Sequence, residues 1–390
     1  MRVAQISLGR FVHHFSLARE LLNRNYLSQL ITGYPWCKVS NEGIPREKLV
    51  TVPWLFAPYM ALNRFGLADN FAGRGLNWKA HENLDNYVAR HLPDADILFG
   101  LSGSGLRSGR RFQQRGGIYV CDRGSTHIVY QERILRAEFA RWGLVFNKTH
   151  VKIRERELEE YAVSDCITVP SEFCKRTFLA EGHSAEKIKV VPYGVPLRDF
   201  YPTGIPSEES FSILFVGQIS LRKGVPYLIE AFQRFKHPHK RLTMVGLPTT
   251  DIKPCLAKAD LRGVQLLGRV SLDRLRSLMS TSSVMVVPSL EEGMAIVQGQ
   301  ALACGCPLII SEATGGEELI EHGREGLIVP ARSSQSLLDG FHALAEDPQM
   351  RRRLAREALL TAKRAGGWSA YTERLLAIFF SQLDNKPTII

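Results

Sequence analysis

The stretch SVMVVPSLEEGMAIVQGQALACGCPLI, residues 283–309, decides the fold of this chain. It contains a short β-branched apolar run at 284–287, followed by a polar loop that ends at Gly293. A helix-compatible segment covers about 294–304, and a second apolar run begins at 308. This order predicts a strand, a loop, a helix and a second strand, which is one βαβ unit of a parallel sheet.

The loop of this unit lies where open parallel sheets bind ligands, beyond the carboxyl end of a strand and at a helix N-terminus. Unpaired backbone N–H groups there favour an anion such as a nucleotide diphosphate. Glu292 stands in this loop, and its carboxylate would repel a phosphate unless it faces other groups, such as hydroxyls. The alternative is that Glu292 is a helix-start acid favoured by the helix dipole. The local pattern leaves both interpretations open.

Strands, turns and helices alternate along the rest of the chain. Residues 2–7 read as a strand, and Gly9 lies in the turn before a helix whose apolar residues are spaced by three and four. The alternation restarts at 212–216, after the stretch 196–210, which is rich in proline, serine and charge. Such a composition is typical of a linker. The sequence therefore predicts an α/β protein with a domain boundary near this stretch.

Two adjacent cations, Arg222 and Lys223, follow the predicted strand at 212–216 and precede a helix. An arginine grips two phosphate oxygens with its planar fork, and a lysine adds a point charge. The pair therefore suits a diphosphate, and a solvated basic turn is the alternative.

A second polar cluster, DRGSTH at 122–127, follows the predicted strand at 118–121. Two interpretations of this cluster are open. It faces a ligand, or it only begins the next helix, with Asp122 as the N-cap of that helix. Asp94 and Asp96 look like a DxD metal site, but they precede a strand, whereas ligand residues of such sheets follow the strand. We therefore expect no metal site at these two acids.

The order of these motifs resembles the retaining family-four (group 1) glycosyltransferases, which have the GT-B fold. The resemblance rests on Pro-Ser-x-x-Glu-Gly, an apolar run and Ala-Cys-Gly-x-Pro-Leu-Ile-Ile within 288–310, and on Lys-Ile-x-Val-x-Pro-x-Gly-Val at 187–195. It is strongest over 165–330 and moderate over 1–130. The chain departs from the family pattern at three places: Gln300 replaces the second motif glutamate, Gly293-Met294-Ala295 replaces Gly-Phe-Gly, and Gly217-Gln218-Ile219 replaces Gly-Arg-Leu.

The resemblance implies two Rossmann-like domains that face a central cleft. Residues 1–195 would form the acceptor-side domain, residues 196–365 the donor-binding domain, and the helix in 366–390 would cross back to the first domain. It implies a retaining, metal-independent hexosyltransferase that needs no cofactor. The enzyme would move a sugar from a nucleotide-sugar donor to a glycan or lipid-linked acceptor.

The resemblance also implies a set of site residues. Glu292 would act on the sugar, and Asp122, Arg123 and His127 compete for the place that faces the donor sugar, with Asp122 and His127 as the catalytic candidates. Gln300 stands where a glutamate normally accepts two ribose hydroxyls, and its amide can accept one hydrogen bond and donate one. The donor-binding residues would be Gly9, Gly217, Arg222, Lys223, Val270, Gly293, Met294, Ala295, Ile296 and Gln300.

Two rival functions remain within reach of the sequence. One is a GT-B relative that epimerises or hydrolyses a sugar nucleotide. The other is a non-catalytic nucleotide-sugar-binding subunit, which Gln300 and Ala295 make conceivable.

Charge and composition bear on partners and location. The net charge is +11, which favours anionic partners, but no nucleic-acid motif is present and we expect no nucleic acid. No apolar run approaches the ~20 residues that span a bilayer, and the seven cysteines fit reduced thiols of a cytoplasmic protein. We expect a peripheral protein on the inner face of the membrane. It would dock on anionic lipid through the arginines of 105–115, aided by Trp54, Phe56 or Phe65.

Overall fold

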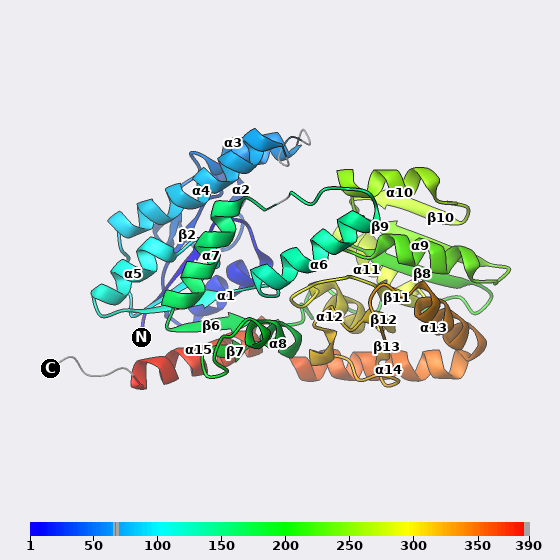
Figure 1. Ribbon diagram of the computed structural model, residues 1–390. Coiled ribbons are helices and arrows are strands. Elements are labelled where there is room, and N and C mark those ends of the chain that lie inside the picture. Colours follow the sequence, from blue (N-terminus) through cyan, green and yellow to red (C-terminus); the bar gives the residue numbers. More distant parts are fainter. Residues whose placement is uncertain (65–66, 68–69, 148, 386–390) are drawn as a thin grey trace.

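The computed structural model describes residues 1–64, 67, 70–147 and 149–385. Within them the chain forms two parallel sheets, one in each half of the molecule (Figure 1). The predicted α/β class is confirmed. Phe65, one of the suggested membrane anchors, lies outside the described residues.

The first half builds a seven-stranded sheet in the order β3-β2-β1-β4-β5-β6-β7. Its strands are β1 (Val3–Ser7), β2 (Leu27–Thr32), β3 (Leu49–Thr51), β4 (Ile97–Leu101), β5 (Ile118–Asp122), β6 (Cys166–Val169) and β7 (Ile188–Val190). Its helices are α1 (Val12–Asn23), α2 (Trp36–Val39), α3 (Phe56–Arg64), α4 (Phe71–Arg90), α5 (Leu106–Gln114), α6 (Ile128–Arg141), α7 (Val151–Val163) and α8 (Glu172–Ala180), with the 3-10 turn η1 (Arg46–Lys48).

The second half builds a six-stranded sheet in the order β10-β9-β8-β11-β12-β13. Its strands are β8 (Phe211–Val216), β9 (Lys240–Val245), β10 (Val264–Gly268), β11 (Val284–Val287), β12 (Leu308–Ser311) and β13 (Gly326–Val329). Its helices are α9 (Val225–Arg234), α10 (Lys253–Lys258), α11 (Leu272–Thr281), α12 (Ile296–Ala303), α13 (Ser334–Glu346) and α14 (Pro348–Ala365), with the 3-10 turns η2 (Thr250–Ile252) and η3 (Gly316–Glu318). Helix α15 (Trp368–Asp384) follows.

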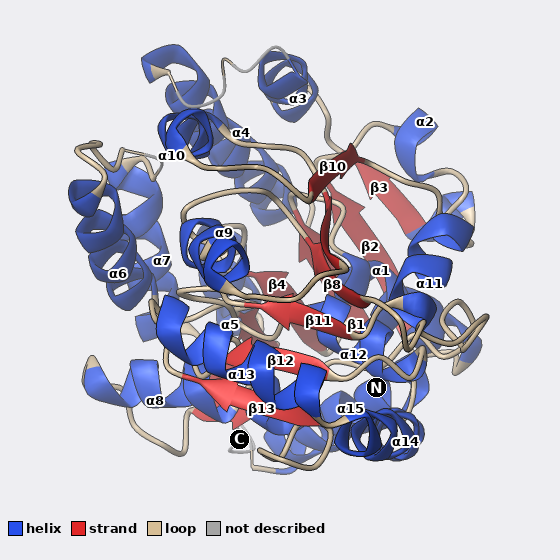
Figure 2. Ribbon diagram, turned by 90° about the vertical axis from the view of Figure 1, so that its right-hand side faces the viewer, coloured by secondary structure: helices blue, strands red, loops and turns tan. Residues whose placement is uncertain are grey.

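Alternate residues of each central strand enter different apolar layers. In β11, Val284 and Val286 pack into the layer of α9 and α13, whereas Met285 and Val287 pack into the layer of α12 and α14. A strand with both faces covered needs a continuous apolar run, which is what the sequence VMVV supplies. Helices surround both sheets in the same way (Figure 2).

The chain crosses between the two halves twice, and the crossings touch. The backbone N–H of Val195 donates to the carbonyl oxygen of Gly366 at 2.9 Å. After this point α15 packs against α1 of the first half, so that α14 and α15 run along one side of both halves (Figure 1). The predicted linker 196–210 contains no helix or strand. The domain limits at 195 and 365 stay predictions.

Candidate functional site

The strand order of each sheet contains a switch point, on either side of which the chain adds strands in opposite directions. In the second sheet this switch point lies between β8 and β11, because β9 and β10 extend to one side and β12 and β13 to the other. Open parallel sheets bind their ligands at the carboxyl ends of the strands at such a point. The loops that follow β8 and β11 carry Arg222, Lys223 and Glu292, so the fold brings these predicted site residues together.

The loop after β8 is fixed against the loop after β11 by close backbone contacts. Gly224 begins α9 with a left-handed φ of 67°, and a Cβ there would lie 1.9 Å from the carbonyl oxygen of Pro288. The N–H of Leu290 donates to the carbonyl oxygen of Arg222 at 2.8 Å. A side chain at 224 is therefore excluded, and the two loops form one surface. Gly217, the first residue of the β8 loop, adopts φ 149°.

Each cation of the β8 loop faces an acid of the β11 loop. Arg222 Nε lies 2.9 Å from Glu291 Oε2, and Lys223 forms an ion pair with Glu292. Arg222 Nη2 is also 3.8 Å from Glu292 Oε2. Glu292 is the acid that we predicted to act on the sugar, whereas Glu291 was not predicted. The two adjacent acids in the sequence, Glu291 and Glu292, are the signal that could have pointed to Glu291.

Glu291 is fully buried and collects donors from the first half of the chain. Its Oε1 accepts from the hydroxyls of Ser125 and Thr126, both at 2.6 Å, and its Oε2 accepts from Gln131 Nε2 at 2.9 Å. Burial alone would raise the pKa of this carboxyl, but the charge of Arg222 and these hydrogen bonds lower the pKa to about 2. Glu291 is therefore ionised at any neutral pH.

Gly293 lies where the two halves meet backbone to backbone. A Cβ at Gly293 would be 2.1 Å from the carbonyl oxygen of Gly124, and Ser171 Oγ donates to the carbonyl oxygen of Gly293 at 2.7 Å. Gly315 is held as closely on the other side, because a Cβ added at Gly315 would lie 2.0 Å from the carbonyl oxygen of Gly293. The loop after β11 is therefore fitted between the first half and the loop after β12.

Helix α12 begins two residues later than the sequence predicts. Ala295 is its N-cap in an extended conformation, with φ −72° and ψ 109° and with no side-chain cap among the described residues. The first turn, which includes Ile296, therefore presents backbone N–H groups at the switch point. Met294 is buried and turned away from it, since its Sδ accepts from the N–H of Tyr193 at 3.3 Å. Gln300 lies half-buried on α12.

Asp122 ends β5 and is held by two histidines of α1. His13 Nε2 and His14 Nε2 lie 3.0 and 3.1 Å from Asp122 Oδ2, and Thr168 Oγ1 donates to Oδ1 at 2.7 Å. Burial lowers the pKa of His14, and the two histidines hold the pKa of Asp122 far below its usual range despite burial. Among the described residues this trio is also a group whose ligand atoms lie close enough to hold a metal ion. Gly9 lies in the turn between β1 and these histidines.

The other two candidates of this loop differ in where they point. Arg123 is buried and forms an ion pair with Glu157 at 2.8 Å. His127 caps α6 through its own Nδ1, and its ring packs against Tyr161, Phe178 and His183. The structure does not bring His127 to the acid and cation pairs, because its ring is enclosed by α7 and α8. A role for His127 toward the donor sugar finds no support in this geometry.

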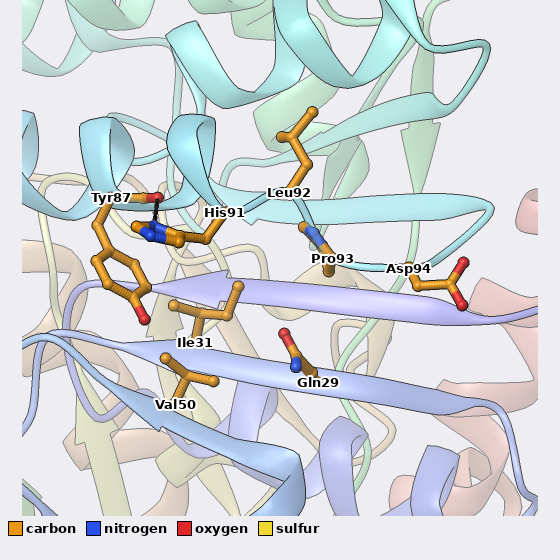
Figure 3. Close-up of a pocket in the computed structure, with 8 residues that line it drawn as sticks. All are labelled: Gln29, Ile31, Val50, Tyr87, His91, Leu92, Pro93 and Asp94. Atoms are coloured by element: carbon orange, nitrogen blue, oxygen red, sulfur yellow. Dashed lines mark hydrogen bonds between the residues drawn. The ribbon is translucent and has the colours of Figure 1, made fainter.

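Two of the cavities in the described part of the chain are relevant here. One of about 210 Å³ lies beside the site and joins both halves, being lined by Gln131, Leu135, Phe139, Phe146, Thr149, Gln218, Ser220, Arg222 and Asp251. The other, of about 230 Å³, lies between the end of α4 and the strands β2 and β3 (Figure 3). None of the predicted donor-binding residues lines it, and its Asp94 is engaged by Arg2. The first cavity is therefore the one that belongs to the site.

Val270 follows β10, two strands away from β8 on the same edge of the sheet. It is partly buried against the large apolar cluster. This packing does not test the predicted contact between Val270 and the donor, which stays a prediction.

Comparison with known proteins agrees with this geometry. Residues 200–360 match the family described as "Glycosyl transferases group 1". The chain is 28% identical over 253 residues to the D-inositol 3-phosphate glycosyltransferase of Pseudarthrobacter chlorophenolicus, an alignment covering 59% of this chain and 60% of that protein. Similarly, it is 25% identical over 222 residues to the alpha-maltose-1-phosphate synthase of Mycolicibacterium smegmatis, covering 50% and 57%. The chain thus spans about 60% of the length of these curated relatives.

Solved structures match almost the whole chain. The sucrose-phosphate synthase of Thermosynechococcus elongatus has a TM-score of 0.70 at 19% identity and covers 99% of this chain and 100% of its own. The Anabaena protein HepE, solved in complex with UDP, has a TM-score of 0.69 at 14% identity and covers 98% and 100%. The predicted resemblance to the group 1 glycosyltransferases and the predicted GT-B fold, two Rossmann-like domains facing a cleft, are therefore confirmed.

Proposed function

We propose that the protein is a retaining glycosyltransferase that moves a hexose from a nucleotide-sugar donor to a glycan or lipid-linked acceptor. The observation that carries the proposal is the pairing of Arg222 and Lys223 with two glutamates at the switch point of the second sheet. Phosphate-binding cations and a hydroxyl-binding carboxylate are both needed by a sugar diphosphate. HepE, a structural relative, is known in complex with UDP.

In this proposal the diphosphate lies against Arg222, Lys223 and the first turn of α12. These groups stabilise the charge that develops on the diphosphate as the bond between it and the anomeric carbon breaks. The bonding electrons stay on the departing diphosphate, and the acceptor hydroxyl forms the new bond on the same face of the sugar. The proton of that hydroxyl passes to the departing diphosphate. No metal or cofactor enters this scheme.

Glu292 has the second role, which is to hold sugar hydroxyls and orient the donor. In the present structure its carboxylate is occupied by Lys223. A diphosphate that binds Lys223 would take over this cation, and Glu292 would then be available to the sugar. Gln300, farther along α12, would bond one ribose hydroxyl as acceptor and another as donor.

The rival functions make different demands on the same site. A hydrolase or epimerase consumes or converts the donor without an acceptor, and a binding subunit consumes none. Gln300 replaces the second glutamate of the family motif, and this replacement is the reason to test these two rival functions.

The experiment has two stages. A thermal-shift screen of nucleotide sugars comes first, in which a ligand at about 100 times its dissociation constant adds roughly 2.7 kcal/mol to the free energy of unfolding. The donor found is then incubated with and without glycan and lipid-linked acceptors. Donor consumption that depends on an acceptor supports the transferase, whereas equal consumption without one supports a hydrolase or epimerase. Binding without turnover under every condition supports the subunit.

We further propose that the protein works as a peripheral protein on the inner face of the cytoplasmic membrane. None of the helices in the described part of the chain is both long and apolar enough to cross a membrane. On α5, Arg107 and Arg110 are exposed but pair with Glu82 and Glu159. Arg111 and Arg115 are exposed as well, and the described residues show no ion pair for either. The basic surface of α5 therefore rests mainly on these two side chains.

The aromatic anchors divide into two groups. Trp54 is 69% exposed, whereas Phe56 is 9% exposed and packs in the core, so Phe56 is ruled out as an anchor. Trp54 precedes α3, which packs on α4, and α4 in turn packs on α5, where Arg107 reaches Asn86.

A further inference from the structure

The carboxylate of Glu291 joins its own loop to two segments that are remote in the sequence, residues 125–131 and Arg222. Ser125 and Thr126 come from the loop after β5, Gln131 from α6, and Arg222 from the loop after β8. The first three belong to the first half of the molecule, and Arg222 and Glu291 belong to the second. The carboxylate is thus satisfied by donors from both halves at once.

A fully buried carboxylate is stable only when such donors are in place, because an unpaired buried charge is very unfavourable. Glu291 is 0% exposed and accepts five hydrogen bonds from these side chains and from the N–H of Thr126. Separation of the halves would remove four of them at once. The arrangement around Glu291 is therefore specific to the closed molecule.

Glu291 also fixes the direction of the Arg222 side chain. Arg222 Nε donates to Glu291 Oε2 at 2.9 Å and to the carbonyl oxygen of Glu291 at 3.2 Å. The guanidinium is planar, so holding Nε sets the direction of both terminal nitrogens. Of these, Nη2 is 3.4 Å from Ser125 Oγ, and the side chain as a whole is 34% exposed. The end of the fork therefore points to the cleft while its inner edge is anchored.

The neighbouring pair is built differently. Lys223 offers a single ammonium, and in this structure Glu292 takes it, so a diphosphate must compete for that cation. Arg222 is held through Nε at 2.9 Å, whereas its terminal Nη2 makes only longer contacts, to Ser125 Oγ at 3.4 Å and to Glu292 Oε2 at 3.8 Å. The two adjacent glutamates therefore have distinct tasks, one anchoring and one exchangeable.

We propose that Glu291 is a positioning residue, which aims Arg222 at the donor diphosphate only when the two halves of the molecule are together. Closure of the cleft and assembly of the diphosphate site then depend on one carboxylate. The proposal rests on the proposed function and names a residue that acts through Arg222 rather than on the substrate itself.

The test is a double-mutant cycle with Glu291→Gln and Arg222→Gln. Binding of UDP, GDP, ADP and inorganic pyrophosphate is measured by calorimetry for the wild type, both single variants and the double variant. An amide cannot accept from all of these donors, so Glu291→Gln should weaken diphosphate binding by roughly 10- to 100-fold, the range for a charge-assisted hydrogen bond. In the Arg222→Gln background the same change should add little, because its effect passes through Arg222.

Glu138→Gln is the matched control. Glu138 is also a glutamate with 0% exposure, and it bonds Trp142 of its own half and both Tyr227 and Arg332 of the other half. Its substitution should lower the melting temperature as Glu291→Gln does but leave diphosphate affinity and its dependence on Arg222 unchanged. Thr126→Val removes one donor and keeps Glu291, so it provides the same test if Glu291→Gln fails to fold. We expect a smaller loss in the same direction.

Three results would overturn the inference. One is equal diphosphate affinity in the wild type and Glu291→Gln. Another is an equal loss for Glu291→Gln with and without Arg222, which would make Glu291 a structural residue only. The third is a loss as large for Glu138→Gln. A folded wild type that binds none of the four ligands would instead overturn the proposed function, and this inference with it.

Discussion

Substitution of Gly293 by alanine tests whether the closed contact between the halves is the active one. The new Cβ would lie 2.1 Å from the carbonyl oxygen of Gly124, 2.7 Å from its carbonyl carbon and 2.9 Å from Pro170 Cγ. Ordinary contact begins near 3.4 Å, so the oxygen is about 1.3 Å too close. A backbone oxygen cannot rotate away as a side chain would. The two halves must therefore separate by about that distance, or the loop carrying Glu292 must shift.

Either movement displaces the donor-binding loop relative to the first half, where the acceptor is expected. Misplacement of reacting groups by about 1 Å can cost about 100-fold in rate. We expect the kcat of Gly293→Ala to fall by roughly that factor, together with a lower melting temperature, because the same movement disturbs the donors of buried Glu291 and the apolar layer that both halves share. The assay is acceptor-dependent turnover at saturating donor, with thermal unfolding measured on the same preparation.

Gly75→Ala is the matched control. Gly75 lies inside α4, and a Cβ there meets no atom within 4 Å. Alanine in a helix interior is favoured over glycine by roughly 0.5–1 kcal/mol, so this variant should be slightly more stable and fully active. Wild-type kcat in a folded Gly293→Ala protein would refute the reasoning, because it would show that turnover does not need the Gly124 contact.

Four further results are expected. Lys223→Ala should lower turnover by roughly 100-fold or more, as loss of one oxyanion donor does, and wild-type turnover in the folded variant would remove Lys223 from the diphosphate site. Activity should persist in excess EDTA, since Arg222, Lys223 and the N-terminus of α12 already balance the charge of the diphosphate. A loss of activity that Mg²⁺ or Mn²⁺ restores would contradict this, and restoration by Zn²⁺ would point to Asp122 and its histidines. The pKa of Glu291 is about 2 in the folded protein, against an ordinary value of 4.5, so the ionised carboxylate stabilises the fold fully above pH 4.5 and loses this effect as the pH falls toward 2. The difference in melting temperature between wild type and Glu291→Gln should therefore shrink from pH 5 to pH 3, and a constant difference would rule out this ionisation. Anionic but not neutral vesicles should sediment the protein in a salt-sensitive way, and replacing Arg111 and Arg115 by glutamate should abolish this; recovery in the supernatant with both lipids would exclude membrane docking.

The parts of the fold that the sequence predicts are those fixed by local pattern. The run VMVV becomes β11, and both of its faces are buried because valine and methionine alternate between two apolar layers. The start of α12 was less predictable, since Met294 and Ala295 are compatible with a helix. Tertiary contacts decide there, because Met294 is drawn to the backbone of Tyr193.

The candidate site could be predicted where the order of the sheet brings residues together. Arg222 and Glu292 follow neighbouring strands of one sheet, so their proximity follows from the strand order. Glu291 could not be chosen over Glu292 from the sequence, because its partners Ser125 and Thr126 lie more than 160 positions away and in the other half. His127 looks like part of the same polar cluster, but its ring turns into an aromatic layer, and its role toward the donor sugar stays a prediction.

Bonding partners separate the two adjacent glutamates more clearly than any sequence motif. Glu291 has no contact with solvent and has its oxygens filled by donors from both halves, so it cannot change partners without opening the molecule. Glu292 is 8% exposed and is paired with the cation that the diphosphate requires. In the proposed function, the arrival of the diphosphate at Lys223 therefore releases the carboxylate that orients the sugar. Under that scheme a nucleoside diphosphate alone would prepare the sugar subsite, and a free sugar should bind more tightly in its presence than without it.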